Sequence, residues 1–281
     1  MTKMVVVVVM LLYAMFQGYF SEASPSSIAF RLSENIDTRW CGYKQIGEFR
    51  GAGILGLSRG SLGFLSQMNS QGLVHNVIGH CLSSGEGGGF LFLGDDHVPP
   101  SGVSWTPITN NYYEDRDYLS GPADLLFEGN PTKVKGLTLD FDSGSALSFL
   151  NQPNYEHTLN MINKALEGQP MIPAHIQSKE LSICWRQHNA IQSLHRVKKY
   201  FKNLTFRFTN LQDVDMDLPP QAYLILIEGK VCLGIANGDK VGLQNPNLIG
   251  AISMQDKLVI YDNVKHRIGW SSSDCEMDAM A

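Results

Sequence analysis

The stretch Leu137-Thr138-Leu139-Asp140-Phe141-Asp142-Ser143-Gly144-Ser145 joins an apolar run to a short polar turn. The run from 134 to 141 predicts a β-strand, and the turn places a carboxylate at the end of that strand. Gly144 would let the chain turn back sharply, and the Ser145 hydroxyl is expected to hydrogen-bond Asp142 and orient it. An Asp-Ser-Gly triplet also describes ordinary turns. Taken alone, the triplet favours a turn over a catalytic site.

One helix and many short strands are expected after this turn. Pro153 at a helix start and Gly168 after the last apolar position predict a helix between them, and residues 168–180 are expected to form a loop. The final hundred residues contain short apolar runs separated by turn residues. This spacing predicts a β-barrel or sandwich rather than βαβ units, with strands at 204–208, 223–227, 230–235, 248–254, 258–262 and 267–270.

The residues before the turn have a different pattern. Residues 25–50 are polar and predict neither a strand nor a helix, whereas 52–57 predict a buried strand. Ser61 is expected to cap a helix that ends at Gly72, and a strand is expected at 74–78. The glycines at 85–89, followed by Phe90-Leu91-Phe92-Leu93, predict a hairpin. They do not form a phosphate loop, because no Gly-Lys-[Ser/Thr] follows.

Composition limits the possible classes of protein. The 281 residues are 43% hydrophobic and 17% charged, which excludes a disordered chain and provides a core for one large or two modest domains. The net charge of -5 argues against a nucleic-acid partner. The histidines lack metal-ligand spacing and no Cys-x-x-Cys occurs, so neither a metal site nor a cofactor is expected.

The first residues predict passage through the secretory pathway. Lys3, the apolar run 4–16 and the small-residue site Ser21-Glu22-Ala23 are typical of a signal peptide spanning residues 1–23. The run is too short for a comfortable membrane span, so no stable membrane anchor is expected. An uncleaved anchor and a buried strand are the alternatives. An extracellular or vacuolar location would suit the glycosylation sequon Asn203-Leu204-Thr205 and the pairing of most of five cysteines, whose odd number leaves one over.

Segments spread in order along the chain support a family assignment. As a set they resemble the pepsin-like aspartic peptidases, in particular the plant nucellin-like group. They lie at 51–57, 65–67, 79–83, 87–95, 105–107, 141–145, 183–185, 218–220, 223–224, 231–234, 248–250, 259–262 and 268–270. The resemblance runs from about Trp40 to Trp270.

The resemblance implies an all-β fold with few short helices, in which two related lobes face a cleft. Each lobe of the family carries an Asp-[Ser/Thr]-Gly loop and, later, two apolar residues and a glycine that wrap round it. The second lobe is complete, with Asp142-Ser143-Gly144 and Leu248-Ile249-Gly250. The first lobe keeps only Ile54-Leu55-Gly56. Its nearest Asp-Thr pair, at Asp37, is followed by an arginine instead of a glycine.

These departures predict a truncated N-terminal lobe and a complete C-terminal lobe. Further departures are the unidentifiable flap hairpin and Ala251, where relatives usually place an aspartate. The expected organisation is a signal peptide at 1–23, a poorly structured remnant at 24–50, N-terminal-lobe and inter-lobe strands at 51–110, the catalytic-type lobe at 111–275 and a tail at 276–281.

The family's chemistry requires two carboxylates that share one proton around a water molecule. Asp142 is the only expected member of that pair, so the resemblance implies an aspartic endopeptidase that acts on polypeptides, weak or inactive in this chain. One alternative is a non-catalytic, peptide-binding or truncated relative. Another is a homodimer that brings two copies of Asp142 together across a two-fold axis.

The resemblance also implies disulfides. The family pairs the cysteines that correspond to Cys184 and Cys232, which leaves Cys81 and Cys275 as a second pair. Cys41 either lacks its partner or never had one.

Two further features have competing interpretations. Gly56-Leu57-Ser58-Arg59-Gly60 matches a nucleophile elbow, so a serine hydrolase using Ser58 and His266 is a third, weaker hypothesis. Asp140 shares a strand face with Asp142 and is expected to be a solvated or turn residue.

Overall fold

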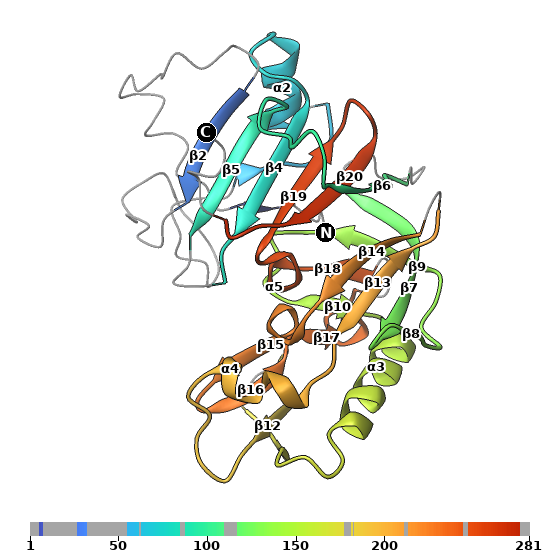
Figure 1. The fold of residues 1–281 in the computed structure, drawn as a ribbon. Helices are drawn as coiled ribbons and strands as arrows, with labels where there is room; N and C mark the ends of the chain where they lie inside the picture. Colours follow the sequence, from blue (N-terminus) through green and yellow to red (C-terminus); the bar gives the residue numbers. More distant parts are fainter. Residues whose placement is uncertain are drawn as a thin grey trace.

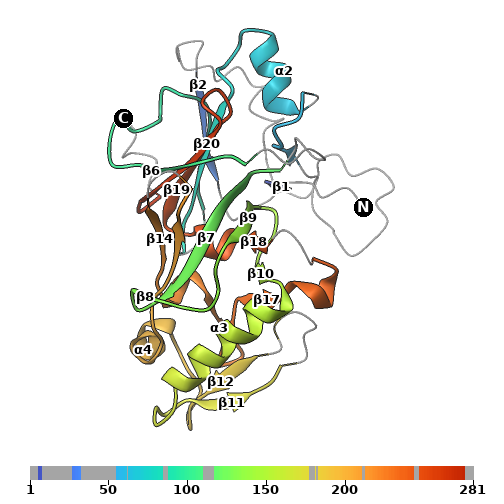
Figure 2. The same cartoon turned by 90° about the vertical axis from the view of Figure 1, so that its right-hand side faces the viewer.

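The protein is described here from a computed structural model, which places residues 6–7, 27–32, 55–61, 63–84, 88–109, 117–176, 181, 183–210, 213–243 and 247–275. Figures 1 and 2 show an upper group of strands with α2 beside it and a lower group of strands with α3 along one side. Most described elements are short strands, which confirms the predicted all-β class.

The upper sheet joins strands from both ends of the chain. Its order is β2-β5-β4-β19-β20-β6, and every pair is antiparallel. Its members are β2 (Ser27–Leu32), β4 (Val77–Leu82), β5 (Gly89–Gly94), β6 (Ser104–Pro107), β19 (Lys257–Asp262) and β20 (Arg267–Ser272). The last two strands of the chain therefore complete a sheet begun near its start.

The lower part contains an eight-stranded sheet and a four-stranded sheet. The larger sheet has the order β14-β13-β7-β9-β18-β10-β17, with β8 on β7, and its pairs β9/β18 and β10/β17 are parallel. Its members are β7 (Leu119–Phe127), β8 (Asn130–Pro131), β9 (Leu137–Phe141), β10 (Ser148–Leu150), β13 (Leu204–Phe208), β14 (Val214–Leu218), β17 (Ile235–Asn237) and β18 (Asn247–Ile249). The smaller sheet contains β11 (Ile172–Ala174), β12 (Cys184–Arg186), β16 (Lys230–Leu233) and β15 (Leu224–Ile227).

The remaining elements are a two-stranded pair and short helices. Strand β1 (Val6–Val7) pairs with β3 (Leu55–Gly56). The helices are α2 (Phe64–Ser70), α3 (Gln152–Ala165), α4 (Leu194–Val197), α5 (Ala251–Met254), η1 (Lys198–Tyr200), η2 (Pro220–Ala222) and η3 (Gly238–Val241). Within the placed residues, no helix combines the length and apolar character needed to cross a membrane.

Several predicted elements are confirmed. Strand β13 has the predicted bounds, and α3 covers the predicted helix with Asn151 as its N-cap and Pro153 in its first turn. The hairpin before Phe90 is confirmed as the antiparallel pair of β4 and β5. Strands β19 and β20 occupy the predicted positions with slightly longer bounds.

Several predictions of local structure are wrong. Residues 27–32 form a strand because β5 supplies the hydrogen-bond partners, and residues 172–174 do so against β12. Residues 248–254 are not one strand, because β18 ends at Ile249 and helix α5 follows. Ser61 does not cap α2, which begins at Phe64 after Gly63.

Aromatic packing joins the upper and lower parts, and each part contains one disulfide. Trp270 of β20 stacks on Phe141 of β9 and lies 5.2 Å, between ring centroids, from Phe208 of β13. The structure contains the Cys184–Cys232 and Cys81–Cys275 disulfides. The second closes a small core cluster formed by Val77, Phe90, Phe92, Leu258 and Ile260. Cys41 lies outside the described residues.

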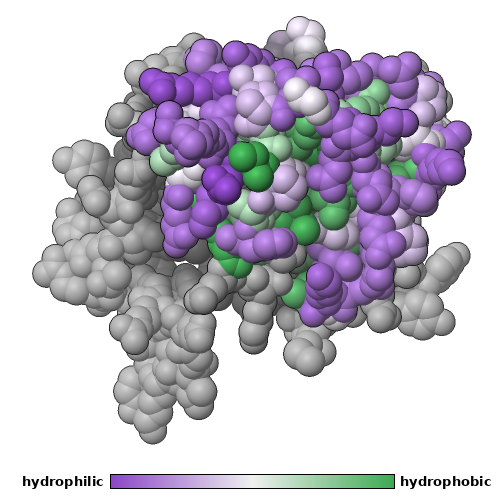
Figure 3. Space-filling view, turned by 90° about the horizontal axis from the view of Figure 1, so that it is seen from below, coloured by the Kyte–Doolittle hydropathy of each residue, from purple (hydrophilic) through white to green (hydrophobic). Residues whose placement is uncertain are grey.

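The surface of the lower part is mainly hydrophilic when seen from below (Figure 3). Large hydrophobic side chains are exposed at only four of the described positions, namely Leu73, Ile172, Val241 and Val264. Single exposed hydrophobic side chains are common on protein surfaces and need no special explanation.

Candidate functional site

The Asp142 loop begins where β9 ends. Asp142 is half-buried, and its Oδ1 accepts a hydrogen bond of 2.9 Å from the backbone N–H of Gly144. The Ser145 N–H closes the turn on the Asp142 carbonyl at 3.2 Å. A backbone amide thus orients the carboxylate, while the role expected of the Ser145 hydroxyl stays a prediction.

The structure brings the loop together with the segment Leu248-Ile249-Gly250. Strand β18 runs parallel to β9, with Ile249 opposite Phe141. The Asp142 N–H donates to the Ile249 carbonyl (3.0 Å), and the Ala251 N–H donates to the Ser145 carbonyl (2.7 Å). Backbone hydrogen bonds therefore hold both ends of the loop.

Two buried serines beneath the loop were not predicted. Ser148 Oγ and Ser253 Oγ lie 2.7 Å apart, and Ser148 Oγ also accepts a 3.0 Å hydrogen bond from the Gly250 N–H. Ser253 Oγ donates to the Ala222 carbonyl at 3.0 Å. The pair satisfies buried polar groups that would otherwise destabilise the fold. Its members are 105 positions apart, so no local sequence pattern reveals their contact.

We expect Gly250→Ala to destabilise the protein by about 1–3 kcal/mol. A Cβ at this position would lie 2.1 Å from the Leu147 carbonyl oxygen and 2.8 Å from that of Ser145. Both neighbours are backbone atoms, so no side chain can rotate away. Urea unfolding measures the effect, with Ala146→Ser on the exposed part of the loop as control. A Gly250→Ala variant as stable as that control would contradict the expected clash.

Tyr118 connects the Asp142 loop to the N-terminal part of the chain. Its carbonyl accepts a 3.0 Å hydrogen bond from the Phe141 N–H, and its hydroxyl donates to the Leu57 carbonyl at 3.0 Å. Burial raises the pKa of Tyr118 to about 12, against the opposing effects of Asn263 and Arg59. The phenol therefore stays protonated and remains a donor. Leu57 follows β3 directly, so Tyr118 connects the segment after β3 to the loop.

A second buried tyrosine lies between Tyr118 and a buried histidine. The rings of Tyr118 and Tyr261 are 4.1 Å apart, and the Tyr261 hydroxyl lies 3.3 Å from His80 Nε2. Burial raises the pKa of Tyr261 well above its usual range, and the charges of Tyr118, Asp142 and Asp140 raise it further. The Tyr261 phenol therefore stays protonated.

Asp140 does not have the expected solvated or turn environment. It lies inside β9 and is only 2% exposed. Asp140 lies within an interior strand of the larger sheet, between β7 and β18, and not in the turn that follows it, so the prediction is wrong. Asp37 and Ile54 lie outside the described residues.

The elements around Ser58 do not form a nucleophile elbow. The two-residue strand β3 pairs antiparallel with β1, and the six-stranded upper sheet is also antiparallel. A nucleophile elbow instead lies between a strand and a helix of an α/β sheet. His266 Nδ1 lies 3.4 Å from Arg59 Nη2. Among the placed residues, no three His, Cys, Asp or Glu side chains are arranged to hold a metal ion.

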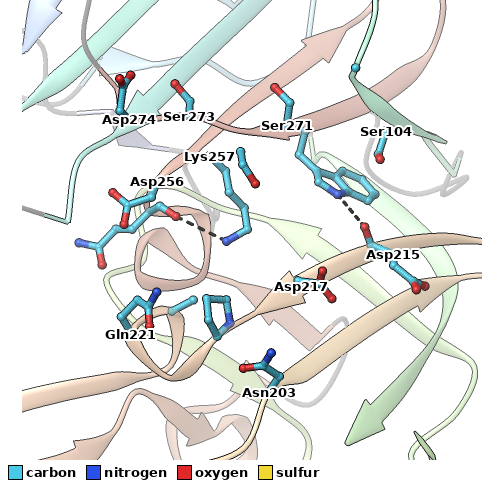
Figure 4. Close-up of a pocket in the computed structure, with 16 residues that line it drawn as sticks. Ser104, Asn203, Asp215, Asp217, Gln221, Asp256, Lys257, Ser271, Ser273 and Asp274 are labelled. Carbon is cyan, nitrogen blue, oxygen red and sulfur yellow. Dashed lines mark hydrogen bonds between the residues drawn. The ribbon is translucent and has the colours of Figure 1, made fainter. Parts of the chain in front are cut away.

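A large cleft opens elsewhere, between β14 and the ends of β19 and β20 (Figure 4). Its volume is about 1190 Å³. Most of the residues that line it are polar, and those used below are Asn203, Asp215, Asp217, Gln221, Asp256 and Lys257. None of these belongs to the Asp142 loop or to the segment that wraps it.

Comparison with protein families identifies the group. The family described as xylanase inhibitor C-terminal matches residues 122–272, and the one described as xylanase inhibitor N-terminal matches residues 37–95. The first match covers more than half of the chain.

Individual relatives agree with these matches. An aspartic proteinase of Oryza sativa subsp. japonica is 37% identical over 267 residues, which are 90% of this chain and 62% of the relative. Aspartic proteinase 36 of Arabidopsis thaliana is 25% identical over 249 residues, which are 84% of this chain and 48% of that protein. This chain therefore spans about half to three fifths of the length of these relatives.

Solved structures share the fold at low identity. Basic 7S globulin from soybean matches with a TM-score of 0.64 and 17% identity, over 82% of this chain and 60% of that structure. Conglutin gamma from lupine seeds matches with a TM-score of 0.63 and 15% identity, over 80% of this chain and 58% of that structure. With these matches and the loop that carries Asp142, the chain belongs to the pepsin-like, plant aspartic protease-like group that includes the xylanase inhibitor family.

Proposed function

We propose that this chain is a pepsin-like protein that binds polypeptides and carries half of the aspartic proteinase dyad, with weak or no endopeptidase activity. The observation that carries the proposal is the single Asp-Ser-Gly loop at 142–144 in the whole sequence. Asp142 is the retained carboxylate, and Ser143, Gly144 and Ser145 support it. The names of the relatives support an evolutionary origin in proteolysis.

The chemistry explains the expected loss of activity. Two adjacent carboxylates share one proton because both cannot ionise at close range, so one acts as base and the other as acid. Such a pair titrates as a unit. An isolated carboxylate orients a water molecule but has no acid partner for the tetrahedral intermediate. Losing a proton-transfer partner lowers the rate by about 10²–10⁴.

A binding role is consistent with the rigid loop. The backbone contacts of Asp142, Ser145 and Ala251 persist without a second carboxylate, so the surface around the loop in the C-terminal part keeps its shape. The name of the matching family describes inhibitors, proteins whose role is to bind another protein. Binding without cleavage is therefore the function that the site supports best.

The test compares the purified chain with its Asp142→Asn variant on a denatured protein substrate at acid pH. We expect the turnover of both chains to stay at least about 100-fold below that of a complete pepsin-like enzyme under the same conditions. Circular dichroism at the assay pH confirms that both chains are folded. Pepstatin-sensitive turnover close to that of the complete enzyme, lost in Asp142→Asn, would overturn the proposal.

Sedimentation and labelling of the same purified protein test two alternative functions. A homodimer that pairs Asp142 across a two-fold axis would sediment as a dimer at micromolar concentration and show turnover. A serine hydrolase would be labelled by a fluorophosphonate, with loss of the label in Ser58→Ala. We expect a monomer that takes up no label.

We also propose that residues 1–23 direct the chain into the secretory pathway. The two disulfides support this proposal, because disulfides persist in oxidising compartments. N-terminal sequencing of the secreted chain, beginning at Ser24, would test it.

A further inference from the structure

We propose that an N-linked glycan on Asn203 occupies the cleft between β14 and the ends of β19 and β20. The inference rests on the proposed secretion of the chain and is independent of its catalytic activity. Asn203-Leu204-Thr205 is the only Asn-x-[Ser/Thr] sequence without proline at the middle position. Asn130-Pro131-Thr132 contains the excluded proline. Any N-glycan on this chain is therefore attached to Asn203.

Asn203 lies on the edge of the cleft with a fixed backbone. Its N–H donates to Glu128 Oε1 (2.9 Å), and its carbonyl accepts from the Glu128 N–H (2.9 Å). The residue is exposed and lines the cleft. Figure 4 places Asn203 at one edge, facing Asp217, with Ser271 and Ser273 at the opposite edge. A sugar attached to this amide starts within the cleft.

Thr205, the third residue of the sequon, shows when the glycan would be attached. Thr205 is buried, and its hydroxyl donates to Asp217 Oδ1 at 2.8 Å. The sequon can be glycosylated only while this hydroxyl is accessible to the enzyme. Attachment of the glycan to Asn203 therefore precedes the pairing of β13 with β14. The cleft then closes around a glycan already in place.

The cleft suits a neutral, hydroxyl-rich occupant. Its volume of about 1190 Å³ exceeds the roughly 300–1,000 Å³ of pockets that enclose a drug-sized ligand, so several sugar units fit. Carboxylate, amide and hydroxyl groups from Asp215, Gln221 and Ser271 offer both acceptors and donors to sugar hydroxyls.

The charges in the cleft disfavour other occupants. The carboxylates of Asp215, Asp217 and Asp256 already accept hydrogen bonds from Arg207, Thr205 and Ser84, respectively. Among the described residues that line the cleft they outnumber the cations, of which Lys257 is the only one, so an anionic ligand is repelled. Arg207 already forms an ion pair with Asp215, so a cationic ligand would have to compete with Arg207 for that carboxylate. An uncharged glycan meets neither obstacle.

Lys257 is the side chain that can show whether the glycan lies in the cleft. Its ammonium projects into the cleft, 3.5 Å from the Gln255 carbonyl (Figure 4). Burial lowers the pKa of Lys257, against the opposing charges of Asp256 and Asp217. Lys202 provides the internal comparison, because it adjoins Asn203 in sequence but does not line the cleft, and its Nζ lies 3.5 Å from Glu128 Oε2.

The experiment uses the full chain secreted from insect cells. Mild periodate oxidation converts diols of the terminal mannoses to aldehydes, and cyanoborohydride then fixes any imine formed with a nearby lysine. We expect peptide mass spectrometry to find the Asn203 glycan linked to Lys257, with loss of this link in Lys257→Arg. A link to Lys202 alone, no link, or no glycan on the secreted chain would each overturn the inference.

Two sequon variants separate the glycan from the asparagine itself. Thr205→Ser keeps the sequon and the hydroxyl that binds Asp217, so glycosylation and the Lys257 link should both persist. Asn203→Gln removes the glycan, and amide hydrogen exchange in residues 270–275 should then become faster than in the wild type. Unchanged exchange there would show that the cleft stays open in the glycosylated chain and would overturn the inference.

Discussion

Between pH 7 and pH 4, the free energy of unfolding should fall by about 3 kcal/mol more in the wild-type chain than in a His80→Asn variant. His80 is buried in β4 with its Nε2 beside the Tyr261 hydroxyl, and its Nδ1 has no hydrogen-bond partner among the described residues. Burial lowers the pKa of His80 from 6.5 to about 4. The folded imidazole therefore stays neutral over a range in which the unfolded one is protonated.

The sign of this pH dependence follows from the number of protons that the folded and unfolded chains bind at His80. Between pH 6.5 and pH 4 the unfolded chain binds more protons at His80 than the folded chain does, so acidification favours unfolding. The contribution of His80 is complete above pH 6.5 and is lost as the pH falls towards 4. Each unit of pKa difference corresponds to about 1.36 kcal/mol, which gives the expected magnitude over this interval.

Urea unfolding at several pH values measures the effect. Carboxylates also add a pH dependence, but they are present in both proteins, so the difference in slope isolates His80. His157→Asn, on the exposed face of α3, is the matched control and should keep the wild-type slope. Equal slopes for wild type and His80→Asn would show that His80 becomes protonated in the folded protein.

Replacing both cysteines of the Cys81–Cys275 disulfide by serine should destabilise the protein by about 2–5 kcal/mol. This bond links β4 to the residues after β20, across a sequence separation of 194. It covers the cluster that contains Phe90, Phe92 and Ile260. Without it, the last strands of the chain lose a covalent attachment to the upper sheet, and the unfolded chain gains conformational freedom.

The Cys184–Cys232 disulfide provides the comparison. Its sequence separation is 48, so its loss should destabilise by about 1 kcal/mol less in a loop-entropy account. Urea unfolding of the two double-serine variants under non-reducing conditions shows which disulfide contributes more to the free energy of unfolding. A larger loss for Cys184→Ser/Cys232→Ser would mean that local packing, rather than loop length, governs the stabilisation.

Much of the fold followed from patterns that lie close together in the sequence. Helix α3 has its capping residue, its proline and its apolar face within one stretch, so its start and extent were predictable. The apolar run of β13 is likewise local. The group resemblance added the association of the Asp142 loop with Leu248–Gly250 and the Cys184–Cys232 pairing, which left Cys81 and Cys275 as a second pair.

Other features depend on partners that no local pattern identifies. Residues 27–32 become a strand against β5, Asp140 is buried within an interior strand of the larger sheet, and Ser148 meets Ser253. Val214–Leu218 alternates polar and apolar residues, a signal for a strand that the sequence analysis did not use. Tyr118 reaches Leu57 only because the chain folds back on itself.

The sequence by itself thus determined the class of fold and the presence of a single Asp-Ser-Gly loop, because covalent neighbours set both periodicity and motif. Tertiary structure alone decided which groups surround that loop, which polar side chains lose contact with water and where a cleft opens. Burial, pKa values and long-range hydrogen bonds arise from contacts between residues tens to hundreds of positions apart. Such contacts exist only once the chain has packed into its tertiary structure.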